Sequence, residues 1–219
     1  MDNPDKACAD RGYTFVEADI NGFIVRCKQK DLLSQDDDAD WDYFDFEAEN
    51  SLAAATGSLI WDASFAIIEL LKPGPASLSQ LLVGKRVLEL GSGIGLAGLC
   101  CAAAGAHVML TDIPSVSEGI LACNVTSNVE SYADAKLRME DSDEQAFRGS
   151  RSGSSWHNSQ PLGRGSCAAG SLDFTKPMAE QALHGNSPFD AEVVLAIDIV
   201  WLKVNTMLGC NQRMPIQAI

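Results

Sequence analysis

Between residues 86 and 112 the sequence alternates an apolar run, a glycine-rich turn, a run of small apolar residues and a second apolar run. We predict a strand at 86–90, a turn at 91–95, a helix at 96–104 closed by Gly105, and a strand at 106–111 that ends in Asp112. Two strands joined by a helix lie parallel with a right-handed crossover, so this stretch predicts an α/β fold. Ligands in such folds bind beyond the carboxyl ends of the strands, where the glycine turn and Asp112 fall.

Further elements are expected on both sides of this unit. Asn21-Gly22 is a favoured two-residue turn and predicts a β-hairpin from the runs 15–19 and 23–27. Helices are expected at 56–71 and, as a short turn, at 78–82, and the capping-box pattern 115–118 predicts a third helix that ends near residue 128. The apolar run 191–197 predicts a central parallel strand buried on both faces, with Asp198 at its carboxyl end.

Composition divides the chain into three parts. Residues 1–50 form an N-terminal extension that holds the hairpin and an acidic, flexible stretch, and residues 51–203 form the α/β domain. Within the domain, 139–169 are rich in Ser, Gly, Arg and Asn, which predicts a disordered insertion. Residues 204–219 show no strand–helix rhythm and are expected to form an irregular tail.

Charge and cysteine content limit the partners. A net charge of −14 repels phosphate backbones, so we expect no nucleic acid and favour a basic segment of a protein; the alternative is that the acid only keeps the chain soluble. No apolar run approaches the roughly 20 residues of a membrane span. The seven cysteines include no CxxC pair, so neither a metal site nor a disulfide framework is expected. The expected setting is the cytoplasm, with the nucleus as an alternative.

The glycine turn and Asp112 together indicate an adenosine-containing cofactor. Glycines let the backbone approach a ligand closely, and an acid about twenty residues further on, at the end of the next strand, can bind both hydroxyls of a ribose. The alternatives are a tight structural turn for the glycines and a cap of the following turn for Asp112. The nicotinamide pattern G-x-G-x-x-G is out of phase here, because Gly95 follows Gly93 after a single residue.

The run Val-Leu-Glu-Leu-Gly-Ser-Gly-Ile-Gly at 87–95 resembles motif I of seven-stranded S-adenosylmethionine-dependent methyltransferases. The chain also resembles their non-histone protein-lysine methyltransferase family in four segments, with Asn124 and Asn128 at the spacing of that family's asparagines. These segments are 56–64, 91–98, 110–112 and 196–201. The resemblance implies a Rossmann-like parallel sheet with helices on both faces and strand order 3-2-1-4-5-7-6.

The resemblance also implies roles for individual residues. It places the cofactor S-adenosyl-L-methionine against Trp61, Gly91, Ser92, Gly93, Asp112, Phe174 and Ile197. Phe174 stands where the family usually has tryptophan. For Trp61 and Phe174 the alternative is plain core packing.

The implied activity is methyl transfer to a lysine side chain of a protein, chiefly a matter of positioning the amine. Asp198 would orient the amine and Trp201 would wall the lysine channel; the alternatives are a strand cap for Asp198 and plain packing for Trp201. Only about four of the seven strands are recognisable, so we expect a C-terminally truncated chain or an aberrant tail. A non-catalytic module that keeps the cofactor pocket or the fold is therefore an alternative function, and a nicotinamide-dependent enzyme is a weaker one.

Overall fold

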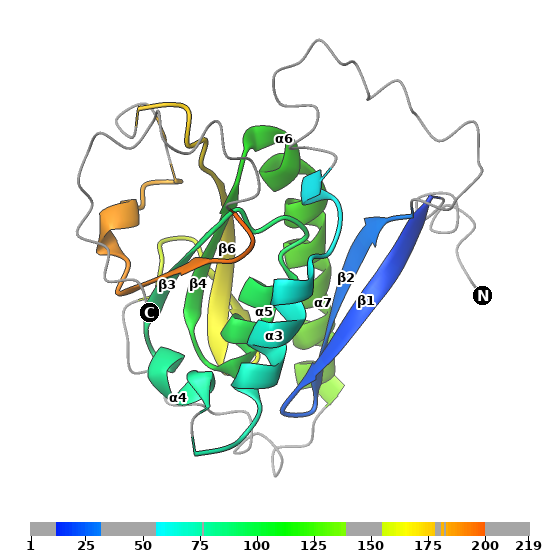
Figure 1. Cartoon of the computed structure of the whole chain (residues 1–219). Coiled ribbons are helices and arrows are strands. Elements are labelled where there is room, and N and C mark those ends of the chain that lie inside the picture. The colour runs from blue at the N-terminus through cyan, green and yellow to red at the C-terminus, as the bar shows by residue number, and fades with distance from the viewer. Residues whose placement is uncertain are drawn as a thin grey trace.

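The structure is a computed structural model that describes residues 12–31, 56–75, 77–138, 155–177, 181 and 183–199. Its centre is a five-stranded sheet of order β5-β6-β4-β3-β7 (Figure 1). The strands are β3 (Arg86–Leu90), β4 (His107–Asp112), β5 (Gln160–Leu162), β6 (Gly165–Ser171) and β7 (Val193–Ala196). All but β5 are parallel, and in chain order these four lie 3-2-1-4, which confirms the first half of the expected order.

The two faces of the sheet bury different sets of side chains. Val87, Val108 and Leu110 belong to the main core, which also holds α5 (Leu96–Ala104). Every residue of α5 is buried, so only small and apolar residues fit there. On the opposite face Leu88 and Met109 pack against Trp156. The predicted parallel sheet is therefore confirmed, with the same boundaries for β3 and α5.

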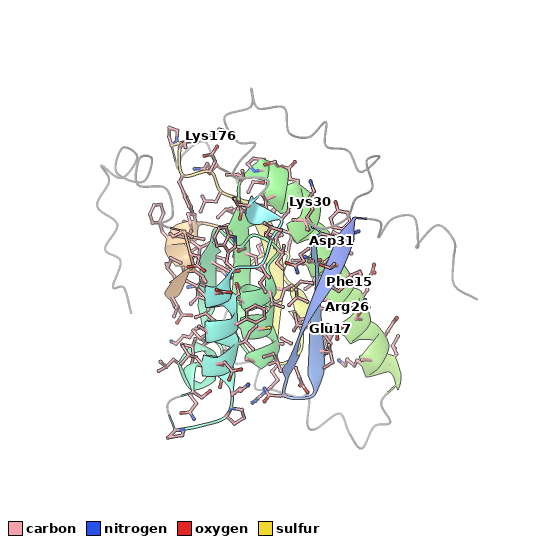
Figure 2. All side chains as sticks on the ribbon, turned by 45° about the vertical axis from the view of Figure 1, so that its right-hand side comes forward. Phe15, Glu17, Arg26, Lys30, Asp31 and Lys176 are labelled. Atoms are coloured by element: carbon pink, nitrogen blue, oxygen red, sulfur yellow. The ribbon has the colours of Figure 1, made fainter. Side chains whose placement is uncertain are left out.

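The N-terminal hairpin is confirmed and is longer than expected, with β1 (Tyr13–Ile20) and β2 (Phe23–Lys30). Its turn has positive φ at both central residues, 53° at Asn21 and 85° at Gly22. The inner face joins the main core, and the hairpin packs against α5 and α7 (Ala122–Arg138) (Figure 1). On the outer face the Arg26 guanidinium lies 3.9 Å from the centre of the Phe15 ring (Figure 2).

Two predicted helices differ from the structure. The helix expected over 56–71 is broken, because residues 56–57 are helical but the chain turns at 58–59. The helix α3 (Asp62–Leu71) begins only after Trp61, its N-cap, which has extended backbone angles, whereas the short helix α4 (Leu78–Leu82) is as predicted. The capping box at 115–118 does not form, because Pro114 starts α6 (Pro114–Val116) and its N-cap Ile113 makes no side-chain cap bond. The chain continues through a π-helical turn η2 (Ser117–Leu121) into α7 (Ala122–Arg138), ten residues beyond the expected end.

The predicted disordered insertion at 139–169 is wrong for its second half. Residues 155–169 hold a buried tryptophan, the strand β5 and most of β6. Trp156 is 3% exposed, and its indole N–H donates to the carbonyl oxygens of Val87 (3.2 Å) and His107 (2.8 Å). The strand β6 reads Gly-Ser-Cys-Ala-Ala-Gly-Ser, a composition that resembles a loop. A Cβ at Gly165 would overlap the carbonyl oxygen of Ala106, so close backbone approach requires glycine there.

Other expectations fall on residues that the structure does not describe. They are the acidic stretch at 32–50, the first half of the insertion at 139–154 and the tail at 204–219. The apolar run 191–197 is confirmed as a parallel strand, β7, but its side chains are half-buried or exposed rather than buried on both faces. No helix within the described ranges has the length and apolar character needed to cross a membrane.

Candidate functional site

Three glycines in the turn after β3 have a left-handed backbone conformation. Gly91, Gly93 and Gly95 have φ values of 62°, 54° and 85°. A Cβ on Gly93 would lie 3.2 Å from the carbonyl oxygen of Gly57, and one on Gly91 would lie 2.8 Å from Cγ2 of Ile199. Three segments that are far apart in the sequence, at 56–63, 91–95 and 197–199, therefore meet at the carboxyl end of β3. The turn has to be bare backbone to let them meet.

Three hydrogen bonds tie this turn to the end of β4. Ser92 N–H donates to the carbonyl of Thr111 (2.9 Å), and Thr111 N–H donates to Ser92 Oγ (3.0 Å). Gly93 N–H donates to Oδ2 of Asp112 (2.8 Å). The predicted pair of glycine turn and acid is thus in direct contact.

The carboxylate of Asp112 retains acceptor capacity for a ligand. Its Oδ1 accepts the N–H of Ile113 at 2.8 Å, so each oxygen receives one backbone N–H. A carboxylate offers about four lone-pair sites, so about two remain, as a pair of ribose hydroxyls requires. Burial raises the pKa of Asp112, and the two backbone hydrogen bonds oppose that rise. The bond to Ile113 shows that the capping role, the alternative for this residue, is also present.

Glu89 lies in the run that resembles motif I, but the sequence analysis gave it no role of its own. The side chain is 2% exposed, and its Oε2 has no hydrogen-bond partner among the described residues. Burial raises the pKa of Glu89 to about 7; a hydrogen bond from Ser92 opposes the rise and the charge of Asp112 adds to it. A single acid inside the apolar run 87–90 is the signal that identifies such a residue, because a buried charge needs a reason.

Trp61 and Asp198 reach the site from the first and last of these segments. Trp61 is 39% exposed, so it is not a core side chain, and its indole N–H donates to the carbonyl of Thr56 (3.2 Å). Oδ2 of Asp198 accepts the N–H of Ala63, in the first turn of α3, at 3.2 Å. The backbone φ of Asp198 is 52°. Asp198 therefore joins β7 to α3, a structural role that sequence spacing alone did not indicate.

The remaining predicted site residues are less closely joined. Phe174 follows β6 at the same end of the sheet and is 49% exposed, so core packing does not describe it. Among the described residues, none of the hydrogen bonds that connect the other segments involves Phe174. Ile197 follows β7 directly and is half-buried, next to Asp198. Trp201 lies outside the described residues.

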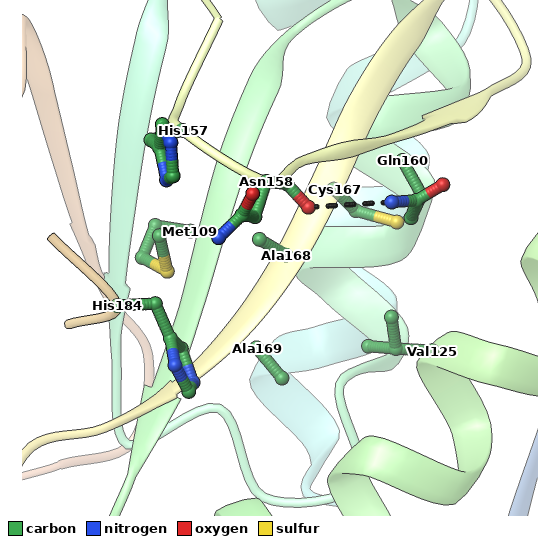
Figure 3. Close-up of a pocket in the computed structure, with 9 residues that line it drawn as sticks. All are labelled: Met109, Val125, His157, Asn158, Gln160, Cys167, Ala168, Ala169 and His184. Carbon is green, nitrogen blue, oxygen red and sulfur yellow. Dashed lines mark hydrogen bonds between the residues drawn. The ribbon is translucent and has the colours of Figure 1, made fainter. Parts of the chain in front are cut away.

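A separate cavity of about 260 Å³ lies along β6 (Figure 3). His157, Asn158, Gln160 and His184 contribute polar groups to it, and Gln160 Nε2 donates to the Asn158 carbonyl at 3.4 Å. None of the predicted site residues lines it. The described residues include no group of three or more His, Cys, Asp or Glu that could hold a metal ion.

The parallel sheet of this order, with a glycine turn bonded to an acid at the end of the next strand, is a Rossmann-like fold. A model of the lysine methyltransferase family matches residues 42–142 of this chain. Protein N-lysine methyltransferase METTL21A of Danio rerio is 39% identical over 72 residues, which are 33% of this chain and 31% of the relative. Protein-lysine methyltransferase METTL21E of Bos taurus is 29% identical over 97 residues, 42% of this chain and 32% of the relative. The chain thus spans about a third of the length of these relatives.

Proposed function

We propose that this protein transfers a methyl group from S-adenosylmethionine to a lysine side chain of a protein substrate. The observation that carries the proposal is the contact between the glycine turn and Asp112 at the carboxyl ends of β3 and β4. The family match of residues 42–142 and the lysine methyltransferase names of both relatives support the same activity.

The residues at the strand ends fit this cofactor. Asp112 has two acceptor positions left for the hydroxyls of a ribose. The glycine turn allows close approach of the methionine end, and the exposed face of Trp61 favours contact with a cationic sulfonium. When bound, S-adenosylmethionine supplies a methyl group activated by positive charge on sulfur.

In the methyl transfer, the protein has to present the substrate lysine as a neutral amine. An ammonium has no lone pair, so the lysine has to lose a proton before it reacts, and removal from water favours that loss. We propose that Asp198 orients the amine, because its carboxylate lies at the carboxyl end of β7 beside the start of α3. Trp201 remains the proposed wall of the lysine channel.

The substrate and setting are further proposals. The net charge of −14 favours a basic protein segment as substrate, through long-range attraction. The free thiols of Cys27, Cys100, Cys101 and Cys167 are buried within the described core, which suits a reducing compartment, and we propose the cytoplasm. Cell fractionation followed by immunoblotting tests this setting, and a signal confined to the secretory pathway would contradict it.

Transfer of a tritium-labelled methyl group to lysate proteins tests the activity. We expect label on lysine with the wild-type chain and at least tenfold less with Asp112→Ala, because about two hydroxyl contacts are lost at roughly 1 kcal/mol each. Glu192→Ala is the matched control: this acid also accepts a backbone N–H, from Arg86 at 3.0 Å, but at the opposite end of β3. Cofactor binding without any transfer would support the non-catalytic module instead.

A further inference from the structure

The edge of β2 that faces α7 is completed by two asparagine side chains instead of a third strand. Asn128 Oδ1 accepts the N–H of Arg26 (2.9 Å), and its Nδ2 donates to the Arg26 carbonyl (2.8 Å). Asn124 makes the same pair of bonds to Lys28, at 2.8 and 3.0 Å. Positions four apart on a helix are about 6 Å apart, and positions two apart on a strand are about 7 Å apart, so the two spacings match.

Asn124 makes one bond that Asn128 does not. Its second Nδ2 hydrogen goes to the carbonyl of Ile94 at 2.9 Å, whereas that of Asn128 goes to the Asn124 carbonyl at 2.8 Å. Ile94 lies between Gly93 and Gly95, before the N-cap of α5, so the intrahelical ladder does not use its carbonyl. Asn124 is 2% exposed, and its amide has three partners, so its orientation is fixed.

The glycine turn is therefore held from two sides. On one side Gly93 N–H is bonded to Asp112 at the end of β4. On the other side the Ile94 carbonyl is bonded through Asn124 to the backbone of β2. A change in the position of β2 would be transmitted to the turn through a single side chain.

The end of β2 also holds the segment that carries Trp61. Lys30 N–H donates to the Ser58 carbonyl at 2.9 Å, and Ile60 N–H donates to Oε1 of Gln29 at 3.1 Å. The hairpin thus contacts two of the segments that meet at the site, although it contributes no residue to the strand ends themselves.

We propose that Asn124 is a positioning residue for the cofactor site, which it connects to the N-terminal hairpin. The inference rests on the proposed function for its effect on affinity, but the bond to Ile94 can be tested without any ligand. Asn128 is the matched control, because it holds the same strand edge by the same pair of bonds and does not reach the turn.

The first measurement is calorimetric titration of S-adenosylhomocysteine into the wild type, Asn124→Ala and Asn128→Ala, with the melting temperature of each. We expect Asn124→Ala to bind about tenfold more weakly, because the buried Ile94 carbonyl loses its partner. Asn128→Ala should bind within about twofold of wild type at a similar loss of melting temperature, since it removes as many hydrogen bonds. Equal weakening by both variants would overturn the proposal and leave only a structural role for the hairpin. Asn124→Asp keeps the acceptor for Lys28 but loses both donors, so it should bind no better than Asn124→Ala.

The second measurement is hydrogen exchange of the ligand-free proteins. The amides of Gly93 and Gly95 are bonded to Asp112 and to the Ser92 carbonyl. Asn124→Ala should speed their exchange about tenfold, by the loss of about one buried hydrogen bond, whereas Asn128→Ala should speed exchange at Arg26 alone. Unchanged exchange at the turn in Asn124→Ala would overturn the proposal. If the wild type binds no S-adenosylhomocysteine, the proposed function fails, and the exchange result alone decides the role of Asn124.

Discussion

The buried carboxyl of Glu89 makes the stability of this protein depend on pH in a direction that can be worked out. Burial raises its pKa from the ordinary 4.5 to about 7, so the folded chain holds this proton more tightly than the unfolded chain. The resulting stabilisation is complete below pH 4.5 and is lost as the pH rises through about 7. A difference of about 2.5 units corresponds to about 3 kcal/mol, of which about 2 kcal/mol is lost between about pH 5.5 and pH 8.

Glu89→Gln removes the titration and keeps the shape of the side chain. Urea unfolding of wild type and variant at pH 5.5 and pH 8 gives four free energies of unfolding. The difference in free energy of unfolding between the two proteins should change by about 2 kcal/mol between pH 5.5 and pH 8, and the variant should gain relative stability at pH 8. Effects of the substitution that do not depend on pH cancel in this comparison. Parallel pH profiles for the two proteins would refute the reasoning, because Glu89 would then have the same pKa in both states.

Two substitutions test the fold and the turn. Trp156→Phe should lower the free energy of unfolding by about 1–3 kcal/mol, because two buried carbonyls of β3 and β4 lose their donor. Trp61→Phe, at a partly exposed position, should lower it less. Chemical denaturation measures both losses, and equal losses would contradict this prediction. Gly93→Ala should lower the free energy of unfolding by about 1–2 kcal/mol because of the positive φ at this residue, and it should also weaken S-adenosylhomocysteine binding. Gly74→Ala, whose Cβ meets nothing within 4 Å, should change neither stability nor binding. Unaltered affinity of Gly93→Ala in calorimetry would count against close approach of the ligand to the glycine turn.

The centre of the fold could be predicted because its residues are consistent at every level. The strand 86–90, the glycine turn and the helix 96–104 combine apolar runs of the right length with glycines at both ends. The order of the four parallel strands came with the family resemblance and agrees with the structure.

The errors have identifiable physical causes. The strand β6 has small and polar residues because it lies where backbones approach closely, so its composition resembles a loop. The helix expected from residue 56 rests on apolar residues at helical spacing from Ile60 onward, but the chain turns at 58–59 and is bonded there to the end of β2. No local pattern reports such tertiary contacts.

Only part of the candidate site could be predicted from the sequence. The glycine turn and Asp112 lie at strand ends, which sequence periodicity can locate. Glu89 was part of the motif I run, but it was given no role of its own because it lies within the apolar strand 86–90. The contact of Asp198 with Ala63 joins residues 135 positions apart, and only the fold reveals it.

Calorimetric titration of the wild-type chain with S-adenosylhomocysteine, repeated with Asp112→Ala, tests the central claim most directly. We predict one binding site per chain for the wild type and at least a tenfold weaker interaction for the variant, from the loss of roughly two hydrogen bonds to hydroxyls. A wild-type chain that gives no binding heat and no rise in melting temperature with this ligand, yet binds NAD, would contradict the account.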